Sequence, residues 1–207
     1  MKNFIKKHFE IILLINTIVF VFFKPNMQQF GERISMIMFG TLAFFYLASG
    51  VMVFLDKQRV NRSIRLIYMM GLWAVAMTVI GVMARIALIQ MSFELLVICV
   101  SSLIGILIYT WMNYTRIEKE ENKKAFAYFL QPLVLRCILA IFIGGGFLLM
   151  TNYAIYNTFG TNRRDPVYVQ KVVNAYENPQ DTVIVNDFKA YDETKRNTVT
   201  ETNKNGK

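Results

Sequence analysis

The first 159 residues alternate long apolar stretches with short connections that are polar and basic. The apolar stretches cover residues 11–23, 34–55, 66–91, 95–112 and 133–159. A helix needs about 20 residues, each rising about 1.5 Å, to cross about 30 Å of hydrocarbon. Four stretches reach that length or nearly so, and the first reaches it only by recruiting apolar residues on its N-terminal side. The pattern predicts an all-α integral membrane protein, with a bundle of about five transmembrane helices in residues 1–159.

The fifth apolar stretch has recognisable ends. Gln131-Pro132 precedes it, and proline is accepted in the first turn of a helix because the N–H groups there have no helical partner. Gly160 follows it, and glycine commonly ends helices. We therefore expect the fifth membrane helix to occupy residues 133–159.

The polar remainder predicts a small extramembrane segment over 160–191 and a disordered tail over 192–207. Asp165-Pro166 is typical of a helix start, and apolar side chains follow at i, i+3, i+4 and i+7, namely Val169, Val172, Val173 and Tyr176. The β-branched run Thr182–Val185 predicts a short strand. The Asn-, Thr- and Lys-rich end is typical of disorder.

One helix and one strand cannot bury their apolar side chains by themselves. They must lie on the membrane domain or dock on another polypeptide, for instance by strand addition. The candidate partner-docking residues of this soluble tail are Val169, Val172, Val173, Tyr176, Val183 and Val185.

The charge of the chain is concentrated in its membrane half. Of a net charge of +9, residues 1–159 supply 15 Lys+Arg against 7 Asp+Glu, and residues 160–207 supply 8 against 7. Basic connections between apolar stretches are typical of anchors that face anionic lipid. A nucleic-acid surface would need a folded basic face with stacking aromatics, and none is apparent. We expect membrane lipids as partners and no nucleic acid.

The distribution of lysine and arginine predicts an orientation. With the N-terminus inside, eleven lie inside: Lys2, Lys6, Lys7, Lys57, Arg59, Arg62, Arg65, Arg116, Lys119, Lys123 and Lys124. Five lie outside: Lys24, Arg33, Arg163, Arg164 and Lys171. Positive charge collects on the cytoplasmic side, which favours a cytoplasmic N-terminus and an extracytoplasmic tail. Arg163 and Arg164 do not fit this orientation, and the tail is cytoplasmic instead if one of the five stretches does not cross. The Asn, Lys, Ile and Phe richness resembles that of AT-rich bacterial genomes, so we expect a multi-pass protein of a bacterial inner membrane.

Charged residues inside or beside the apolar stretches are candidate sites. Arg85 lies near the outer end of the third stretch, and Glu94 follows after a very short turn. Opposite charges at that spacing predict an ion pair, Arg85–Glu94, at the membrane edge. Arg136 lies near the inner end of the fifth stretch, where we expect it to reach the interface as an anchor.

Small residues suggest where helices approach one another closely. They form two small-x-x-x-small patterns and an oligoglycine run, and the helix-packing candidates are Ser101, Gly105, Ala140, Gly144, Gly145 and Gly146. The alternative for the glycine run is a hinge or an unwound segment of a transporter.

Residues that commonly perform catalysis are scarce. The one histidine, His8, adjoins Lys7 at the membrane entry, so no serine–histidine pair can form within the bilayer. No spacing typical of metal ligands or phosphate-binding loops occurs. The sequence predicts no catalytic residue, cofactor or metal site.

Two classes of function rank ahead of an intramembrane enzyme, which the single histidine disfavours. The first is a non-catalytic membrane-embedded subunit of a multiprotein bacterial envelope assembly, for example a secretion or conjugation apparatus. It would act as a scaffold or anchor through helix packing and a partner-docking tail, with other envelope proteins or further copies of itself. The alternative is a small transporter or channel subunit, which the glycine run and the intramembrane arginines favour.

Overall fold

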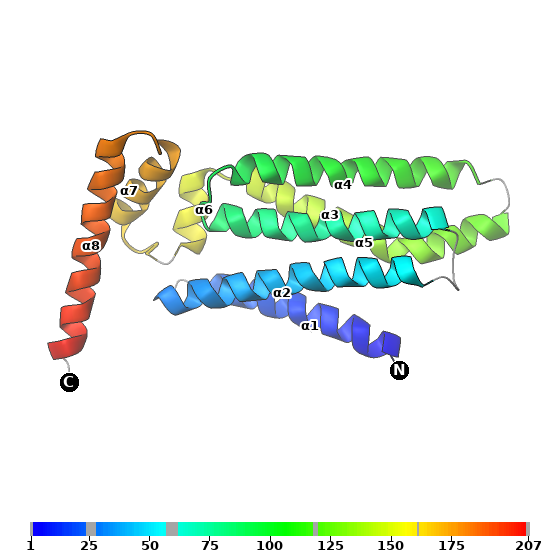
Figure 1. The fold of residues 1–207 in the computed structure, drawn as a ribbon, viewed down its shortest axis with the longest axis horizontal. Helices are drawn as coiled ribbons and strands as arrows, with labels where there is room; N and C mark the ends of the chain where they lie inside the picture. The colour runs from blue at the N-terminus through cyan, green and yellow to red at the C-terminus, as the bar shows by residue number, and fades with distance from the viewer. Residues whose placement is uncertain (1, 24–27, 57–61, 118–119, 161, 206–207) are drawn as a thin grey trace.

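The computed structural model of the protein describes residues 2–23, 28–56, 62–117, 120–160 and 162–205. The regular elements within these ranges are all helices: α1 (Lys2–Phe23), α2 (Gln28–Leu55), α3 (Arg62–Ile86), α4 (Ser92–Thr115), α5 (Glu120–Leu149), α6 (Asn152–Phe159), α7 (Pro166–Glu177) and α8 (Thr182–Asn205). Helices α1 to α5 lie lengthwise in one bundle, and α6 to α8 gather at the end opposite the start of α1 (Figure 1).

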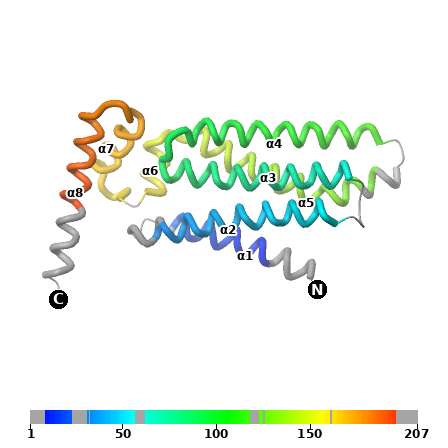
Figure 2. Tube along the Cα trace, viewed as in Figure 1, coloured from blue at the N-terminus to red at the C-terminus, as the bar shows by residue number. Residues whose placement is uncertain are grey.

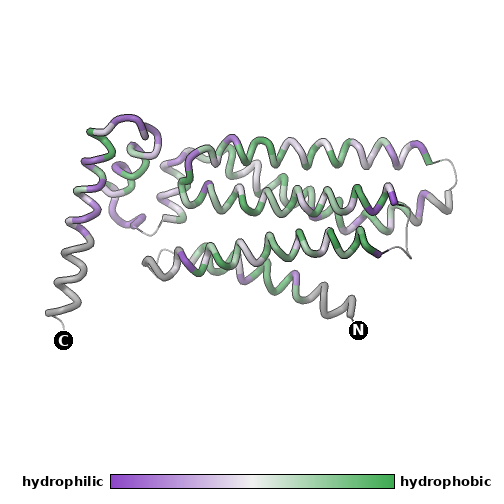
Figure 3. Tube along the Cα trace, in the orientation of Figure 1, coloured by the Kyte–Doolittle hydropathy of each residue, from purple (hydrophilic) through white to green (hydrophobic). Residues whose placement is uncertain are grey.

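Four of the helices are long and apolar enough to cross a membrane, namely Arg33–Leu55, Arg62–Ile86, Ser92–Thr115 and Phe126–Leu149. Apolar residues run along the bundle, whereas apolar and polar residues are mixed in α7 and in the coloured part of α8 (Figure 3). The prediction of an all-helical, multi-pass membrane protein is therefore confirmed. Helix α1 contributes a shorter apolar stretch, Phe9–Phe22, so a fifth crossing by α1 stays a prediction.

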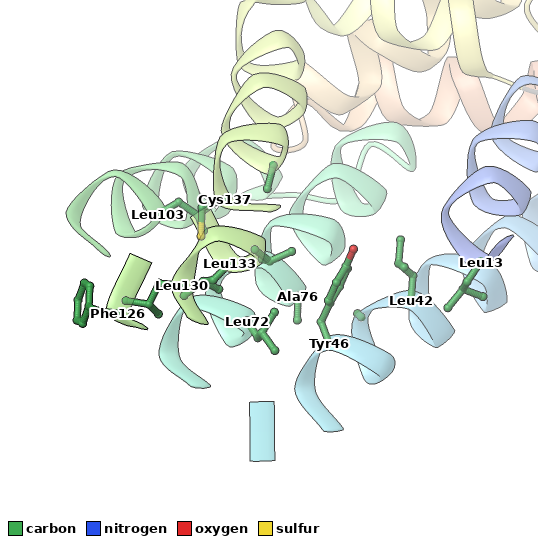
Figure 4. Close-up of a cluster of buried hydrophobic side chains, with 13 residues drawn as sticks. Leu13, Leu42, Tyr46, Leu72, Ala76, Leu103, Phe126, Leu130, Leu133 and Cys137 are labelled. Atoms are coloured by element: carbon green, nitrogen blue, oxygen red, sulfur yellow. The ribbon is translucent and has the colours of Figure 1, made fainter. Parts of the chain in front are cut away.

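Helix α3 lies at the centre of the bundle, where it packs against α2, α4 and α5, while α1 lies along α2. The largest buried cluster in the described part of the chain draws side chains from all five of these helices (Figure 4). They are Leu103 on α4; Leu130, Leu133 and Cys137 on α5; Leu72 and Ala76 on α3; Leu42 and Tyr46 on α2; and Leu13 on α1. Many large apolar side chains point outward, as expected where the surrounding solvent is lipid.

Helix α5 differs from its prediction at both ends. It begins at Glu120, so Pro132 lies inside the helix and does not start it. The reason is a buried stripe, formed by Phe126, Leu130 and Leu133, that continues across the proline at helical spacing. Membrane helices accept an interior proline because neighbouring groups satisfy the backbone that it frees.

The predicted fifth stretch, 133–159, is divided between two helices. Helix α5 ends at Leu149, and α6 starts after Thr151, whose hydroxyl accepts a hydrogen bond from the Ala154 N–H at 3.2 Å. Gly160 ends α6, as predicted. A Cβ atom at Gly160 would lie 2.4 Å from the Tyr156 carbonyl oxygen, so close approach of the backbone requires glycine there.

The predicted strand at Thr182–Val185 is wrong, because these residues form the first turn of α8. The Asp181 carboxylate caps this turn, accepting hydrogen bonds from the N–H groups of Val183 at 2.9 Å and Ile184 at 3.2 Å. Beyond the cap, Phe188 follows Ile184 at helical spacing and packs toward α7, which lies beside α8 (Figure 2). Capping and tertiary contact thus override the local β-propensity.

The end of the chain, predicted to be disordered from Asp192, continues α8 to Asn205. Two polar contacts tie the start of this region to α7. The Tyr168 hydroxyl donates to the Asp192 carboxylate at 2.8 Å, and the Lys195 ammonium pairs with the Asp165 carboxylate at 2.7 Å. The helix that begins at Asp165-Pro166 and buries Val169 is confirmed as α7.

Candidate functional site

An ion pair joins α1 to α5 inside the bundle. The Arg136 guanidinium donates from Nε and Nη2 to the two carboxylate oxygens of Glu10, each at 2.5 Å, and from Nη1 to the Tyr68 hydroxyl at 3.1 Å. The side chains of Arg136 and Glu10 are only 24% and 13% exposed. This bidentate geometry is the strongest that a guanidinium and a carboxylate can form.

On α5 and α3 the pair and its Tyr68 partner lie within the apolar spans, whereas on α1 Glu10 lies at the start of the apolar stretch Phe9–Phe22. Along α5, Arg136 is ten residues beyond Phe126, the start of the apolar span, which is about 15 Å. Along α3, Tyr68 is six residues beyond Arg62, about 9 Å. Sequence analysis placed Arg136 near the interface as an anchor. The structure instead turns its guanidinium inward to Glu10, because the earlier start of α5 puts it deeper in the span.

Glu10 was not among the site residues predicted from sequence. It stands at the boundary of the first apolar stretch, where a charge usually only marks the end of a span. Its partner is 126 residues away, and no spacing rule connects them. The one available signal was that Arg136 had no partner within its own helix, which makes an intramembrane acidic residue the natural complement.

A cavity of about 1160 Å³ adjoins the pair, between α1, α2, α3 and α5. Its polar residues include Glu10 and Arg136, and apolar side chains continue from there along α5 to Phe147. The lining residues of α1 and α5 are exposed at one side, including Phe22 on α1 and Leu135 on α5. The cavity therefore opens sideways between α1 and α5, toward the face of the bundle that meets lipid.

A second polar cluster joins α6 and α7 to the bundle. Arg85, in the last turn of α3 and only 5% exposed, donates to the Asn152 side-chain oxygen at 2.5 Å and to the Met150 carbonyl oxygen at 3.3 Å. The Asn152 amide donates in turn to the Glu177 carboxylate at 2.8 Å. The guanidinium also lies 5.3 Å from the centre of the Phe93 ring. Arg85 thus connects α3 to the α5–α6 break and, through Asn152, to α7.

The predicted Arg85–Glu94 pair does not form in the described part of the chain. Glu94 is exposed in the first turn of α4, where the helix dipole favours a negative charge. The break between α5 and α6 supplies Arg85 with a free carbonyl and an amide oxygen instead. A single helix over 133–159, as predicted from sequence, would leave no free carbonyl at Met150, so these partners could not be predicted.

The tail also contacts the turn between α3 and α4. The Gln90 amide donates to the Tyr176 carbonyl oxygen at 3.0 Å, and the hydroxyls of Ser92 and Tyr176 are 3.2 Å apart. Leu88 and Met91 in this turn have φ values of 50° and 61°, a left-handed conformation that is costly for residues with a side chain. Leu88 packs against the buried cluster of the tail.

The apolar stripe of α7 is covered by the chain itself. Val169 and Val173 are buried, Val172 and Tyr176 are partly buried, and their cover comes mainly from the aromatic residues Tyr156, Phe188 and Tyr191, with Leu88. On α8, Val185 is partly buried and Val183 is 76% exposed. In the structure these side chains pack against α6, α8 and the turn between α3 and α4, and docking of the tail on another polypeptide stays a prediction.

Hydrogen bonding and burial shift the pKa values of two side chains where α7 meets α8. The pKa of Asp165 is lowered, first because its carboxylate accepts a hydrogen bond from Lys195 and then because it accepts one from the Tyr168 N–H. The pKa of Tyr168 is raised, mainly by burial of its hydroxyl. A charged carboxylate and a neutral phenol are therefore maintained where α7 meets α8.

The small residues separate into two groups. Ala140 is buried, and a Cβ atom at Gly144 would lie 2.9 Å from a methyl group of Val100 and 3.1 Å from that of Thr78, so this face packs inside the bundle. Ser101 and Gly105 are exposed on α4. Cβ atoms at Gly105, Gly145 and Gly146 would each have no neighbour within 4 Å.

Within the described residues, no group of three or more His, Cys, Asp or Glu side chains could hold a metal ion. Comparison with known proteins adds no further constraint. No protein-family model, no curated protein and no solved structure matches this chain.

Proposed function

We propose that the chain is a non-catalytic, membrane-embedded subunit of a bacterial envelope assembly, such as a secretion or conjugation apparatus, in which it acts as an anchor. The observation that carries this proposal is the junction of Arg85 with Asn152 and Glu177, together with Tyr176 on the α3–α4 turn. An anchor must hold its extramembrane part in a fixed place relative to the membrane. Contacts from α3, α4 and the α5–α6 break to α7 meet that requirement.

The outer face of α4 supports the proposal. Ser101 and Gly105 are exposed one turn apart, between large exposed side chains such as Ile98 and Ile108. Between helices in lipid, small residues let backbones approach closely, and van der Waals packing then drives association. A transmembrane helix of another subunit is the occupant that this face would accept.

Replacing Gly105 by leucine should weaken association with the partner about tenfold or more, without unfolding the bundle. The side chain has open space within the chain, since a Cβ atom there meets nothing within 4 Å. Gentle detergent extraction followed by identification of the co-purifying chains measures the association. Thermal unfolding of the purified variant measures the fold.

Two glycines of α5 provide matched controls. Gly146→Leu also enters open space, on another helix, and should leave association intact. Gly144→Leu should unfold the bundle, because even a Cβ atom at this position would lie 2.9 Å from Val100 and 3.1 Å from Thr78. If Gly105→Leu retained every partner, the α4 face would play no part in assembly. If the captured chain were a second copy of this one, the assembly would be a homo-oligomer.

The orientation that we propose has the N-terminus in the cytoplasm and α6 to α8 outside, in the inner membrane. Support comes from the eleven-to-five distribution of lysine and arginine. In a background without Cys99 and Cys137, single cysteines at positions 57–61 and 118–119 should resist an impermeant thiol reagent in intact cells, and Glu193→Cys should react. Labelling of the two connections but not of position 193 would invert the orientation.

A small transporter or channel subunit is the second candidate. The cavity beside Glu10 and Arg136 favours it, because transporters carry polar sites inside the bilayer. Solute flux through liposomes that contain this chain alone would favour the transporter or channel function over the anchor function.

A further inference from the structure

The cavity between α1 and α5 has one charged end, and the rest of its lining is mainly apolar. Glu10, Arg136 and Tyr68 lie at the charged end. On α5 the lining then continues through Leu139 to Phe147, eleven residues beyond Arg136, which is about 16 Å. A ligand that fills this space must be amphipathic, with an apolar part of about that length.

The lateral opening determines where such a ligand comes from. Leu139 and Phe22 line the cavity and are also exposed, on the face of the bundle that lies in hydrocarbon. Water would find few polar partners along most of the lining. An empty apolar space would forfeit dispersion contacts that an acyl chain supplies. The occupant that the surroundings offer is therefore a membrane lipid.

The ion pair determines which headgroup fits. An anionic headgroup that took the place of Glu10 on Arg136 would leave a carboxylate that is only 13% exposed without a partner, which is costly. A headgroup with only an amine would in the same way leave the Arg136 guanidinium without a partner. A headgroup with both a phosphate and a protonated amine leaves neither charge unpaired. The phosphate matches the forked donors of Arg136, and the ammonium donates to Glu10.

We propose that this cavity binds one phospholipid of the ethanolamine type, which enters sideways between α1 and α5. Its phosphate binds Arg136, its ammonium binds Glu10, and an acyl chain lies along α5 toward Phe147. The Glu10–Arg136 pair holds the site in its lipid-free form and separates when the headgroup inserts. This binding site goes beyond the anchoring function and does not depend on it.

The test is native mass spectrometry of the full chain in detergent, with three phospholipids that share the same acyl chains. The ethanolamine lipid should be retained as a single copy, about tenfold more strongly than the other two. The choline lipid keeps the positive charge but has no N–H donor for Glu10. The glycerol lipid has no positive charge at all.

A pair of substitutions on α5 tests the acyl-chain part of the site. Leu139→Trp places a large side chain in the cavity and should abolish retention of the ethanolamine lipid. Leu149→Trp is the control, because Leu149 is 89% exposed and does not line the cavity, and it should retain the lipid. Thermal unfolding of both variants shows that the fold persists. Free phosphoethanolamine should not compete, since it lacks the acyl chain.

Three results would overturn the proposal. Equal retention of the three lipids would mean non-selective annular lipid. Preference for the glycerol lipid would mean an anion site that does not use Glu10. Unchanged retention by Leu139→Trp would place the lipid outside the cavity. These readouts are separate from co-purification of partner subunits, so failure of the lipid site would leave the anchor proposal standing.

Discussion

Replacing Arg136 by alanine is expected to cost about 3 kcal/mol of folding free energy, the lower end of the usual loss when one partner of a buried ion pair is removed, because this pair is part-buried. The substitution leaves the Glu10 carboxylate, whose side chain is only 13% exposed, without its two donors at 2.5 Å. It also removes the donor to Tyr68. The unfolding midpoint of the purified protein in mixed detergent micelles measures the loss.

A double-substitution cycle isolates the interaction. Changing Glu10 to leucine and Arg136 to methionine together removes both charges and should cost less than Arg136→Ala alone, because no buried charge is left unpaired. Lys124→Ala is the control, an exposed charge on the same helix, and should change stability by less than about 0.5 kcal/mol. If the loss in the double variant equalled the sum of the losses in Glu10→Leu and in Arg136→Met made singly, Glu10 and Arg136 would not interact.

Features determined by local sequence could be predicted. Apolar stretches of sufficient length mark α2, α3 and α4, since a helix in lipid must satisfy its own backbone and show apolar side chains outward. The start of α7 was also predictable, because Asp165 and Pro166 act within one turn: the Asp165 carboxylate accepts from the Tyr168 N–H at 3.0 Å. Such signals need no knowledge of the rest of the fold.

Features that depend on tertiary contact could not be predicted in the same way. The β-branched run Thr182–Val185 favours a strand when read alone, and it is helical because Asp181 caps it and α8 packs on α7. The break after Leu149 is similar, because hydropathy does not distinguish one long apolar helix from two short ones. In each case a neighbouring element decides between conformations that the local sequence allows.

The candidate site shows the same limit most clearly. Glu10 and Arg136 are 126 residues apart, and Arg85 and Asn152 are 67 apart. Sequence analysis paired Arg85 with Glu94 because the two are close along the chain and opposite in charge. Proximity along the chain is a poor guide in a helical bundle, where the direction of each side chain around its helix determines which partner it can reach.

Replacing Arg85 by glutamine is expected to release α7 and α8 from the bundle, whereas Glu94→Gln should have little effect. Arg85 loses its charge-assisted bonds to Asn152 and to the Met150 carbonyl, and hydrogen bonds to charged groups contribute about 1.5 to 3 kcal/mol. Glu94 is exposed and has no ion pair with Arg85, so its substitution should stay within about 0.5 kcal/mol. Hydrogen exchange of the α7 amides measures the release.

The two single substitutions distinguish the junction seen in the structure from the membrane-edge pair that sequence alone suggests. If Arg85 and Glu94 formed a pair, each substitution should accelerate exchange similarly, and reversing both charges together should restore protection. The contacts of Arg85 with Asn152 and Met150 predict that the two substitutions differ and that reversing both charges does not restore protection. Reversal of both charges should be as damaging as Arg85→Glu alone, because a carboxylate at position 85 faces the Met150 carbonyl and the Asn152 side-chain oxygen, neither of which can donate to it.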